Sequence, residues 1–102
     1  EVPGEVTVRV TVLKDREDIP TPFLVTKDRY LTTAADPSLD VCSVKAARKM
    51  QRFLQDHAGL SPEQAGMLLS LAGNLRISQV VNPAKGCIME LPRGLAKESF
   101  TL

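Results

Sequence analysis

The N-terminal part of the chain has the clearest alternation of hydrophobic and polar positions. Between Gly4 and Lys14, polar residues alternate with four valines: Val6, Val8, Val10 and Val12. A period of two places every second side chain on the same face of a strand. The pattern therefore predicts a strand over residues 4–14, with a valine face toward a core and a polar face toward water or a partner.

Two shorter strand patterns follow a charged, proline-containing loop. The segments FLVT and RYLTT lie between Phe23 and Thr33 and flank Lys27-Asp28. Two-residue hairpin turns favour Asn or Gly, so this pair is a weak turn signal. The short spacing nevertheless favours a hairpin.

A helical pattern begins after the hairpin. Asp36 is the predicted N-cap and Pro37 the first helical residue. The next apolar positions recur at helical spacing, at Cys42, Ala46, Ala47, Met50, Phe53 and Leu54. Such a stripe predicts a helix with one buried face. Gly59 is the predicted terminator.

A second helix start stands at Ser61, which Pro62 follows directly and Gln64 follows three residues on. This spacing is typical of a capping box. The stretch from Ala65 to Ala72 is then apolar nearly all round, and Gly66 lies within it. A helix without a polar face is predicted to be buried between two layers. Gly66 would suit a place where another backbone passes close by.

A Gly73-Asn74 corner and two further strands complete the pattern. The first strand has Leu75, Ile77, Gln79 and Val81 on one face, and the second covers 87–91. The order is β-β-β-α-α-β-β. It predicts an α+β fold with an antiparallel sheet of about five strands and two helices packed on one face. A length of 102 residues fits a single domain over 1–102. The tail after 94 is expected to fray unless a partner holds it.

Charge and composition narrow the classes of function. Thirteen basic residues nearly balance twelve acidic ones, which argues against nucleic-acid or membrane-surface binding. No apolar run reaches the length of a spanning helix, and no signal-peptide pattern opens the chain. Two cysteines in apolar patterns, Cys42 and Cys87, predict buried free thiols and a cytoplasmic, reducing location. With a single histidine and no CxxC pair, no metal site is expected within this chain.

No motif identifies a reaction, because the chain has no P-loop, no GxGxxG and no GxSxG elbow. The candidate functional residues are the polar positions of the corner and the strand after it: Asn74, Arg76 and Gln79. If they are buried, Arg76 needs an acceptor and Gln79 needs hydrogen-bond partners. The alternative to a functional role is that these side chains only form hydrogen bonds within the fold.

Four segments of the chain resemble the C-terminal part of the acetamidase/formamidase family. They are EVTVRVTVLK (Glu5–Lys14), RYLTT, AARKMQRFL (Ala46–Leu54) and GLSPEQAGMLLSLAGNLRISQVVNP (Gly59–Pro83), and they stand in the family's order. The last segment is the most specific. The resemblance implies a hydrolase of carbon–nitrogen bonds that converts small linear amides, such as formamide or acetamide, to a carboxylic acid and ammonia.

The resemblance also implies a longer chain and a divalent metal such as zinc in the full-length protein. The family's glycine- and histidine-containing motifs would lie upstream of Glu1, so no catalytic residue is assigned and the chain alone is expected to be inactive. Implied partners are the N-terminal part of the same enzyme or a homo-oligomer, and a small amide substrate. The pocket candidates Asn74, Arg76 and Gln79 could orient a carboxamide or stabilise negative charge.

Two departures from the family keep a second interpretation open. Asn74 stands where the family commonly has an acid, and Ala34 stands where a glycine usually follows the two threonines. A non-catalytic binding or oligomerisation module derived from the family is therefore the alternative. The start at Glu1-Val2-Pro3, close to a predicted strand, is what an excised piece or a processed subunit would look like.

Overall fold

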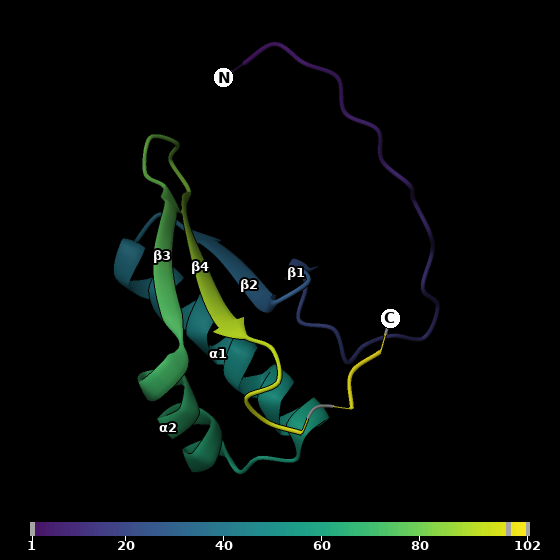
Figure 1. Cartoon of the computed structure of the whole chain (residues 1–102). Helices are drawn as coiled ribbons and strands as arrows, with labels where there is room; N and C mark the ends of the chain where they lie inside the picture. Colours follow the sequence, from purple (N-terminus) through teal and green to yellow (C-terminus); the bar gives the residue numbers. More distant parts are fainter. Residues whose placement is uncertain (1, 98, 102) are drawn as a thin grey trace.

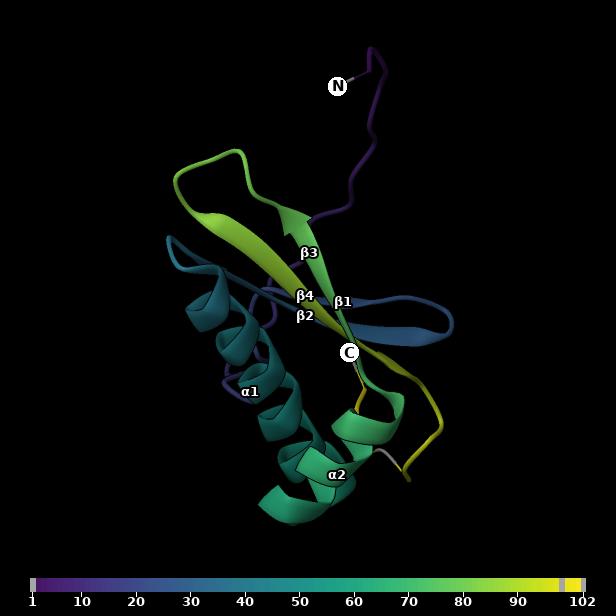
Figure 2. The same cartoon turned by 90° about the vertical axis from the view of Figure 1, so that its left-hand side faces the viewer.

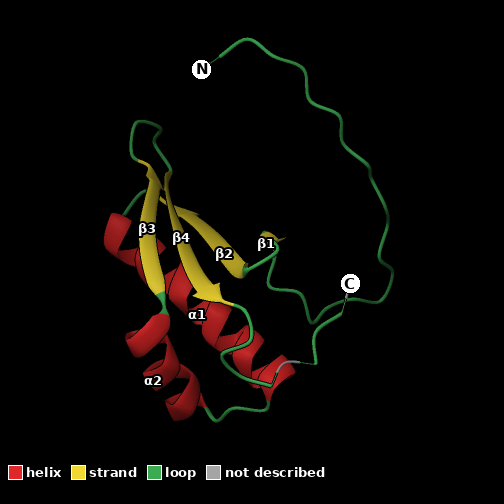
Figure 3. Cartoon of the chain, in the orientation of Figure 1, coloured by secondary structure: helices red, strands yellow, loops and turns green. Residues whose placement is uncertain are grey.

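The computed structural model describes residues 2–97 and 99–101, so the expectation about the start at Glu1 lies partly outside it. Six elements follow one another along the chain (Figure 1): β1 (Phe23–Val25), β2 (Arg29–Asp36), α1 (Leu39–Ala58), α2 (Pro62–Ala72), β3 (Asn74–Gln79) and β4 (Lys85–Pro92). The strands form one antiparallel sheet in the order β1-β2-β4-β3. Helix α1 lies across one face of this sheet and α2 packs against α1 (Figures 2 and 3). The predicted α+β class is confirmed.

The N-terminal strand predicted over 4–14 does not form, so the sheet has four strands rather than five and the order is β-β-α-α-β-β. Residues 2–13 have no regular secondary structure and extend away from the body of the molecule (Figure 1). A strand is held by backbone hydrogen bonds to a neighbouring strand. Within residues 2–97 and 99–101, no strand pairs with this segment, and its valines are exposed: Val6 87%, Val8 72%, Val10 84% and Val12 77%.

The core lies between α1 and the sheet. Its centre is Phe53, whose ring centroid lies 4.8 Å from those of Phe23 and Tyr30 and 5.2 Å from that of Phe100. The C-terminal tail, expected to fray, therefore packs against this cluster through Phe100. Aromatic pairs at such distances contribute beyond the area they bury.

The two predicted thiols are buried and unpaired among the described residues. Burial, together with the smaller effect of the neighbouring Cys42, raises the pKa of Cys87 to about 11. The Cys42 thiol donates to the carbonyl oxygens of Ala34 and Lys85, at 3.2 and 3.3 Å. The sequence-based prediction of buried free thiols is confirmed.

The helix ends follow the sequence closely, with one correction. The N-cap of α1 is Ser38 rather than Asp36, because Asp36 is the last residue of β2 and its carboxylate accepts a bond from the Ser38 backbone. At the other end, Gly59 has φ 64°, the left-handed conformation that glycine adopts without strain. Ser61 and Gln64 form the predicted capping box.

Helix α2 is not buried between two layers as predicted. Only Ala65 is buried, whereas Met67 is 59% exposed and Leu71 86% exposed. One side of α2 packs against α1, and no described element covers the other. Gly66 also meets a side chain instead of a backbone, since a Cβ placed there would lie 3.7 Å from the Gln51 amide nitrogen. Neither helix in the described part of the chain is long and apolar enough to cross a membrane.

Candidate functional site: a carboxylate cluster on the open face of the sheet

A buried carboxylate lies on the face of the sheet opposite α1. Strand β4 alternates, so that Cys87, Met89 and Leu91 point into the core and Glu90 points the other way. Although neither described helix covers this face, Glu90 is only 3% exposed. The long side chains of the neighbouring strands surround it.

Three donors from two strands converge on the Glu90 carboxylate. The Arg76 Nη1 atom lies 2.5 Å from Oε1, while Oε2 accepts from Arg29 Nη1 at 3.0 Å and from Asn74 Nδ2 at 3.2 Å. The strand register explains the meeting. Asn74 of β3 and Leu31 of β2 are the direct partners of Glu90, and each arginine lies two residues along its strand on the same face.

These donors keep Glu90 ionised. Burial by itself raises the pKa of the carboxyl, but the hydrogen bonds from Asn74 and Arg76 and the charges of Arg76 and Arg29 outweigh burial. The net effect is a pKa below the usual glutamate value. The side chains of Arg29 and Arg76 remain 45% and 59% exposed, so each presents further N–H groups to the open side of the cluster.

The structure brings together two of the three predicted residues. Asn74 and Arg76 meet at Glu90, which is the acceptor that Arg76 was expected to need. Gln79 lies apart from them, at the turn between β3 and β4. Its side chain donates to the Ala84 carbonyl and accepts from the Asn82 backbone N–H at 3.1 Å, and this satisfies the predicted need for partners.

Glu90 and Arg29 were missed in the sequence. The available signal was a lone acid in the apolar strand CIMELP, out of phase with Cys87, Met89 and Leu91. A period of two places that acid on the opposite face. Arg29 gave no comparable signal, because its place beside Glu90 depends on the pairing of β2 with β4.

The Glu90 cluster does not offer a set of ligands for a divalent metal. Residues 2–97 and 99–101 contain no group of three or more His, Cys, Asp or Glu side chains arranged to hold a metal ion. All donors in the Glu90 cluster are N–H groups, which repel a cation rather than bind it.

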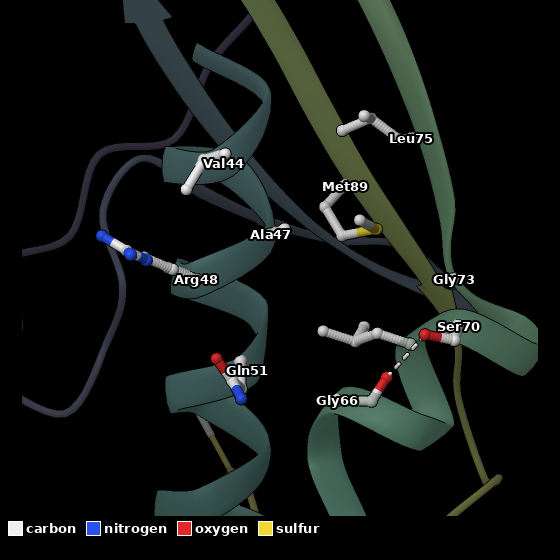
Figure 4. Close-up of a pocket in the computed structure, with 10 residues that line it drawn as sticks. Val44, Ala47, Arg48, Gln51, Gly66, Ser70, Gly73, Leu75 and Met89 are labelled. Atoms are coloured by element: carbon white, nitrogen blue, oxygen red, sulfur yellow. Dashed lines mark hydrogen bonds between the residues drawn. The ribbon is translucent and has the colours of Figure 1, made fainter. Parts of the chain in front are cut away.

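A hollow lies on the other face of the sheet, the one that carries the helices (Figure 4). This groove has a volume of about 420 Å³ and lies between α1, α2 and the β3–β4 pair. Its apolar lining is Val44, Ala47, Leu69, Leu75 and Met89. Leu75 and Met89 are cross-strand partners on the core face, so the groove and the Glu90 cluster lie on opposite faces of the sheet.

Comparison with known proteins identifies solved structures that are similar to this chain. No protein-family model and no curated protein matches it. An acetamidase from Bacillus halodurans matches with a TM-score of 0.71 and 42% identity, over 74% of this chain and 26% of that one. A predicted acetamidase/formamidase from the thermophile Thermoanaerobacter tengcongensis matches with a TM-score of 0.65 and 36% identity, over 69% of this chain and 23% of that one.

The chain therefore shares its fold and more than a third of its aligned residues with one class of solved structures. That class is the acetamidase/formamidase family, and the chain corresponds to a portion of it. The resemblance predicted from the sequence is confirmed to this extent. The chain spans about a quarter of the length of these relatives.

Proposed function

We propose that the chain is the C-terminal portion of an amidohydrolase that splits small linear amides, such as formamide or acetamide, into a carboxylic acid and ammonia. The observation that carries this proposal is the 42% identity to an acetamidase over 74% of the chain, in the same fold. The chain covers only 26% of that relative. The proposed activity therefore belongs to a longer protein, and the chain alone is expected to be inactive.

Within this proposal, the Glu90 cluster contributes to the amide pocket. Hydrolysis of an amide places negative charge on the former carbonyl oxygen, and fixed N–H donors stabilise that charge. Glu90 holds one edge of the Arg76 guanidinium and the Asn74 amide in place. The remaining donors of Arg76 can then orient a carboxamide or meet the developing charge. Gln79 supports the pocket less directly, by fixing the turn that follows β3.

The other parts of the proposed enzyme come from outside this chain. They are a divalent metal such as zinc and the N-terminal part of the same enzyme or another copy of it. We place the enzyme in the cytoplasm, in keeping with two free buried thiols.

The experiment is an ammonia-release assay with formamide and acetamide. The 102-residue chain is assayed alone and mixed with the N-terminal part of the enzyme, each with and without Zn²⁺. We expect no ammonia above background from the chain alone and clear release from the mixture. Ammonia release by the chain alone would refute its dependence on the rest of the enzyme. The absence of ammonia release in every mixture would refute the hydrolase proposal.

A second candidate function is a non-catalytic binding or oligomerisation module. It is favoured by apolar side chains that the described residues leave uncovered, among them Val6, Val10 and Leu71, which are 84–87% exposed. Exposed apolar surface of this kind marks sites of protein association. The discriminating result is a mixture that assembles into a stable complex without releasing ammonia.

A further inference from the structure

The outer edge of β3 is open. Among the described residues, the order β1-β2-β4-β3 places this strand at the end of the sheet, where it pairs only with β4. Its core-face residues Leu75 and Ile77 are 46% and 58% exposed, although they continue the face that α1 covers. An edge with free backbone groups and apolar side chains is a template for another strand.

The same chain carries a strand pattern that pairs with no strand in the described part of the chain. Residues 5–12 alternate four exposed valines with Thr7, Arg9 and Thr11. Figures 1 and 2 show this arm extending away from the helices and the sheet. A β-branched segment with one fully apolar face fits a half-buried position in a sheet far better than water.

The surroundings of β3 suit this arm in particular. A strand added to the open edge would lie about 4.8 Å from β3. Its valines would continue the apolar row of Leu75 and Ile77 on the helix side of the sheet, on the side of β3 that faces away from β4. The polar residues of the arm would then point to the same side of the sheet as Arg76, which is the solvent side.

The arm starts near the β1 edge of the sheet, and β3 of the same chain is the opposite edge. The loop that carries it is fixed at the β1 edge, where Lys49 Nζ donates to the Thr21 carbonyl at 2.8 Å and the Thr33 N–H to the Pro22 carbonyl at 3.2 Å. Asp18 of the same loop lies 3.2 Å from His57 Nε2 at the end of α1. From these anchors, β3 is on the far side of the sheet.

We propose that residues 5–12 of one chain add as a strand to the outer edge of β3 in a second copy, and that the exchange is reciprocal. Reciprocal exchange gives a closed two-fold dimer in which both open edges and both valine faces are covered. This dimer does not depend on the proposed hydrolysis. It assigns the interaction surface to the β3 edge and the helix side of the sheet, opposite the Glu90 cluster.

The test is the molar mass of the chain by light scattering or sedimentation. We expect twice the 11.1 kDa of one chain for the wild type. Val8→Asp on the arm and Ile77→Asp on the edge should each give a monomer, because each buries a charge in the new interface. Thr7→Asp is the matched control on the polar face of the arm and should stay dimeric. Circular dichroism checks the fold of Ile77→Asp, and Val8 makes no contact on which folding depends.

A mixing experiment shows that the contact joins two chains. Val8→Asp keeps a competent β3 edge and Ile77→Asp keeps a competent arm, so their mixture should form a hybrid dimer with one intact contact. Hydrogen exchange of residues 5–12 should slow in that hybrid only on the Ile77→Asp chain. A monomeric wild type would overturn the proposal, whether its arm is protected on its own β3 or exchanges freely. Equal loss of the dimer in Thr7→Asp, or no hybrid on mixing, would overturn it as well.

Discussion

The two faces of the sheet are built differently, although the same strands make both. On the covered face, α1 packs on Tyr30, Met89 and Leu91, and the side chains there are apolar or internally bonded. On the open face, Glu90 is buried by arginines from the neighbouring strands, whose own side chains remain about half exposed. Beneath α1, the chain's own apolar side chains fill the covered face. The open face holds an ionised group in position but leaves the outer side of Arg76 exposed to water.

This difference separates stability from function along a single strand. Met89 and Leu91 belong to the core that keeps the chain folded, and Glu90 between them fixes Arg76 and Asn74. A core side chain needs only volume and apolar contact. A buried carboxylate needs matched donors, and it stabilises little compared with an apolar residue of the same size. Its presence on the open face therefore favours a positioning role.

The largest expected effect is in the covered face. Phe53→Ala removes the ring at the centre of the aromatic cluster, which is fully buried, and should lower the free energy of unfolding by about 3–5 kcal/mol. Urea denaturation measures the loss. Leu71→Ala, at a position 86% exposed, is the control and should change it by less than about 0.5 kcal/mol. A similar loss for both variants would contradict the division between covered and uncovered surfaces.

A smaller effect is expected in the open face. Glu90→Gln keeps the size of the side chain but removes the charge that accepts from Arg29 and Arg76, and should cost about 2 kcal/mol at pH 7. The cost stays below that of a fully buried ion pair because both arginines can turn to water. Urea denaturation at pH 7 measures it. An unchanged free energy of unfolding would show that the cluster does not hold the carboxylate.

The pH dependence of this cost sharpens the prediction. Because the folded-state pKa of Glu90 lies below its usual value of 4.5, its charge stabilises the fold fully above about pH 4.5. That stabilisation is lost as the pH falls through the folded-state pKa. The difference in unfolding free energy between wild type and Glu90→Gln should therefore be constant from pH 7 to about 4.5 and shrink below it. A difference that does not change at low pH would assign the loss to packing.

The smallest effect concerns Asn74, where the resemblance to the family led us to expect an acid. Asn74→Asp replaces a donor to Glu90 with a second carboxylate and should cost about 1 kcal/mol at pH 7. Two adjacent carboxylates raise the pKa of one of them, so this cost should disappear as the pH falls through the raised value. Asn82→Asp, on an exposed turn residue, is the matched control. A cost that grows on acidification would refute the contact with Glu90.

Local sequence signals predicted the local structure well. The capping box at Ser61, the terminator Gly59 and the two buried cysteines are all confirmed. Each depends on residues close in the chain, where capping and periodicity act directly. The N-cap of α1 is the exception, since pairing of β2 with β4 extends the strand to Asp36.

Two further predictions were wrong, the N-terminal strand and the burial of α2. In both cases the sequence pattern indicates an apolar face but does not indicate what covers that face. The valines of residues 5–12 and the apolar side of α2 have the pattern of buried elements, yet the described residues do not cover them. The same limit hid part of the candidate site. Asn74 and Arg76 could be named from their place in the most family-like segment, but Glu90 and Arg29 join them only through strand register.

The most direct test of the account is the kinetics of Arg76→Ala in the enzyme assembled from this chain and the N-terminal part. Arg52→Ala is the control, since Arg52 is 74% exposed on α1 and pairs with Asp56 away from the sheet. For acetamide hydrolysis, we predict a fall in kcat/KM of at least about tenfold for Arg76→Ala, and no change for Arg52→Ala. Equal activity of the two variants, or an assembly that never releases ammonia, would contradict the claim that the open face of the sheet serves the amide.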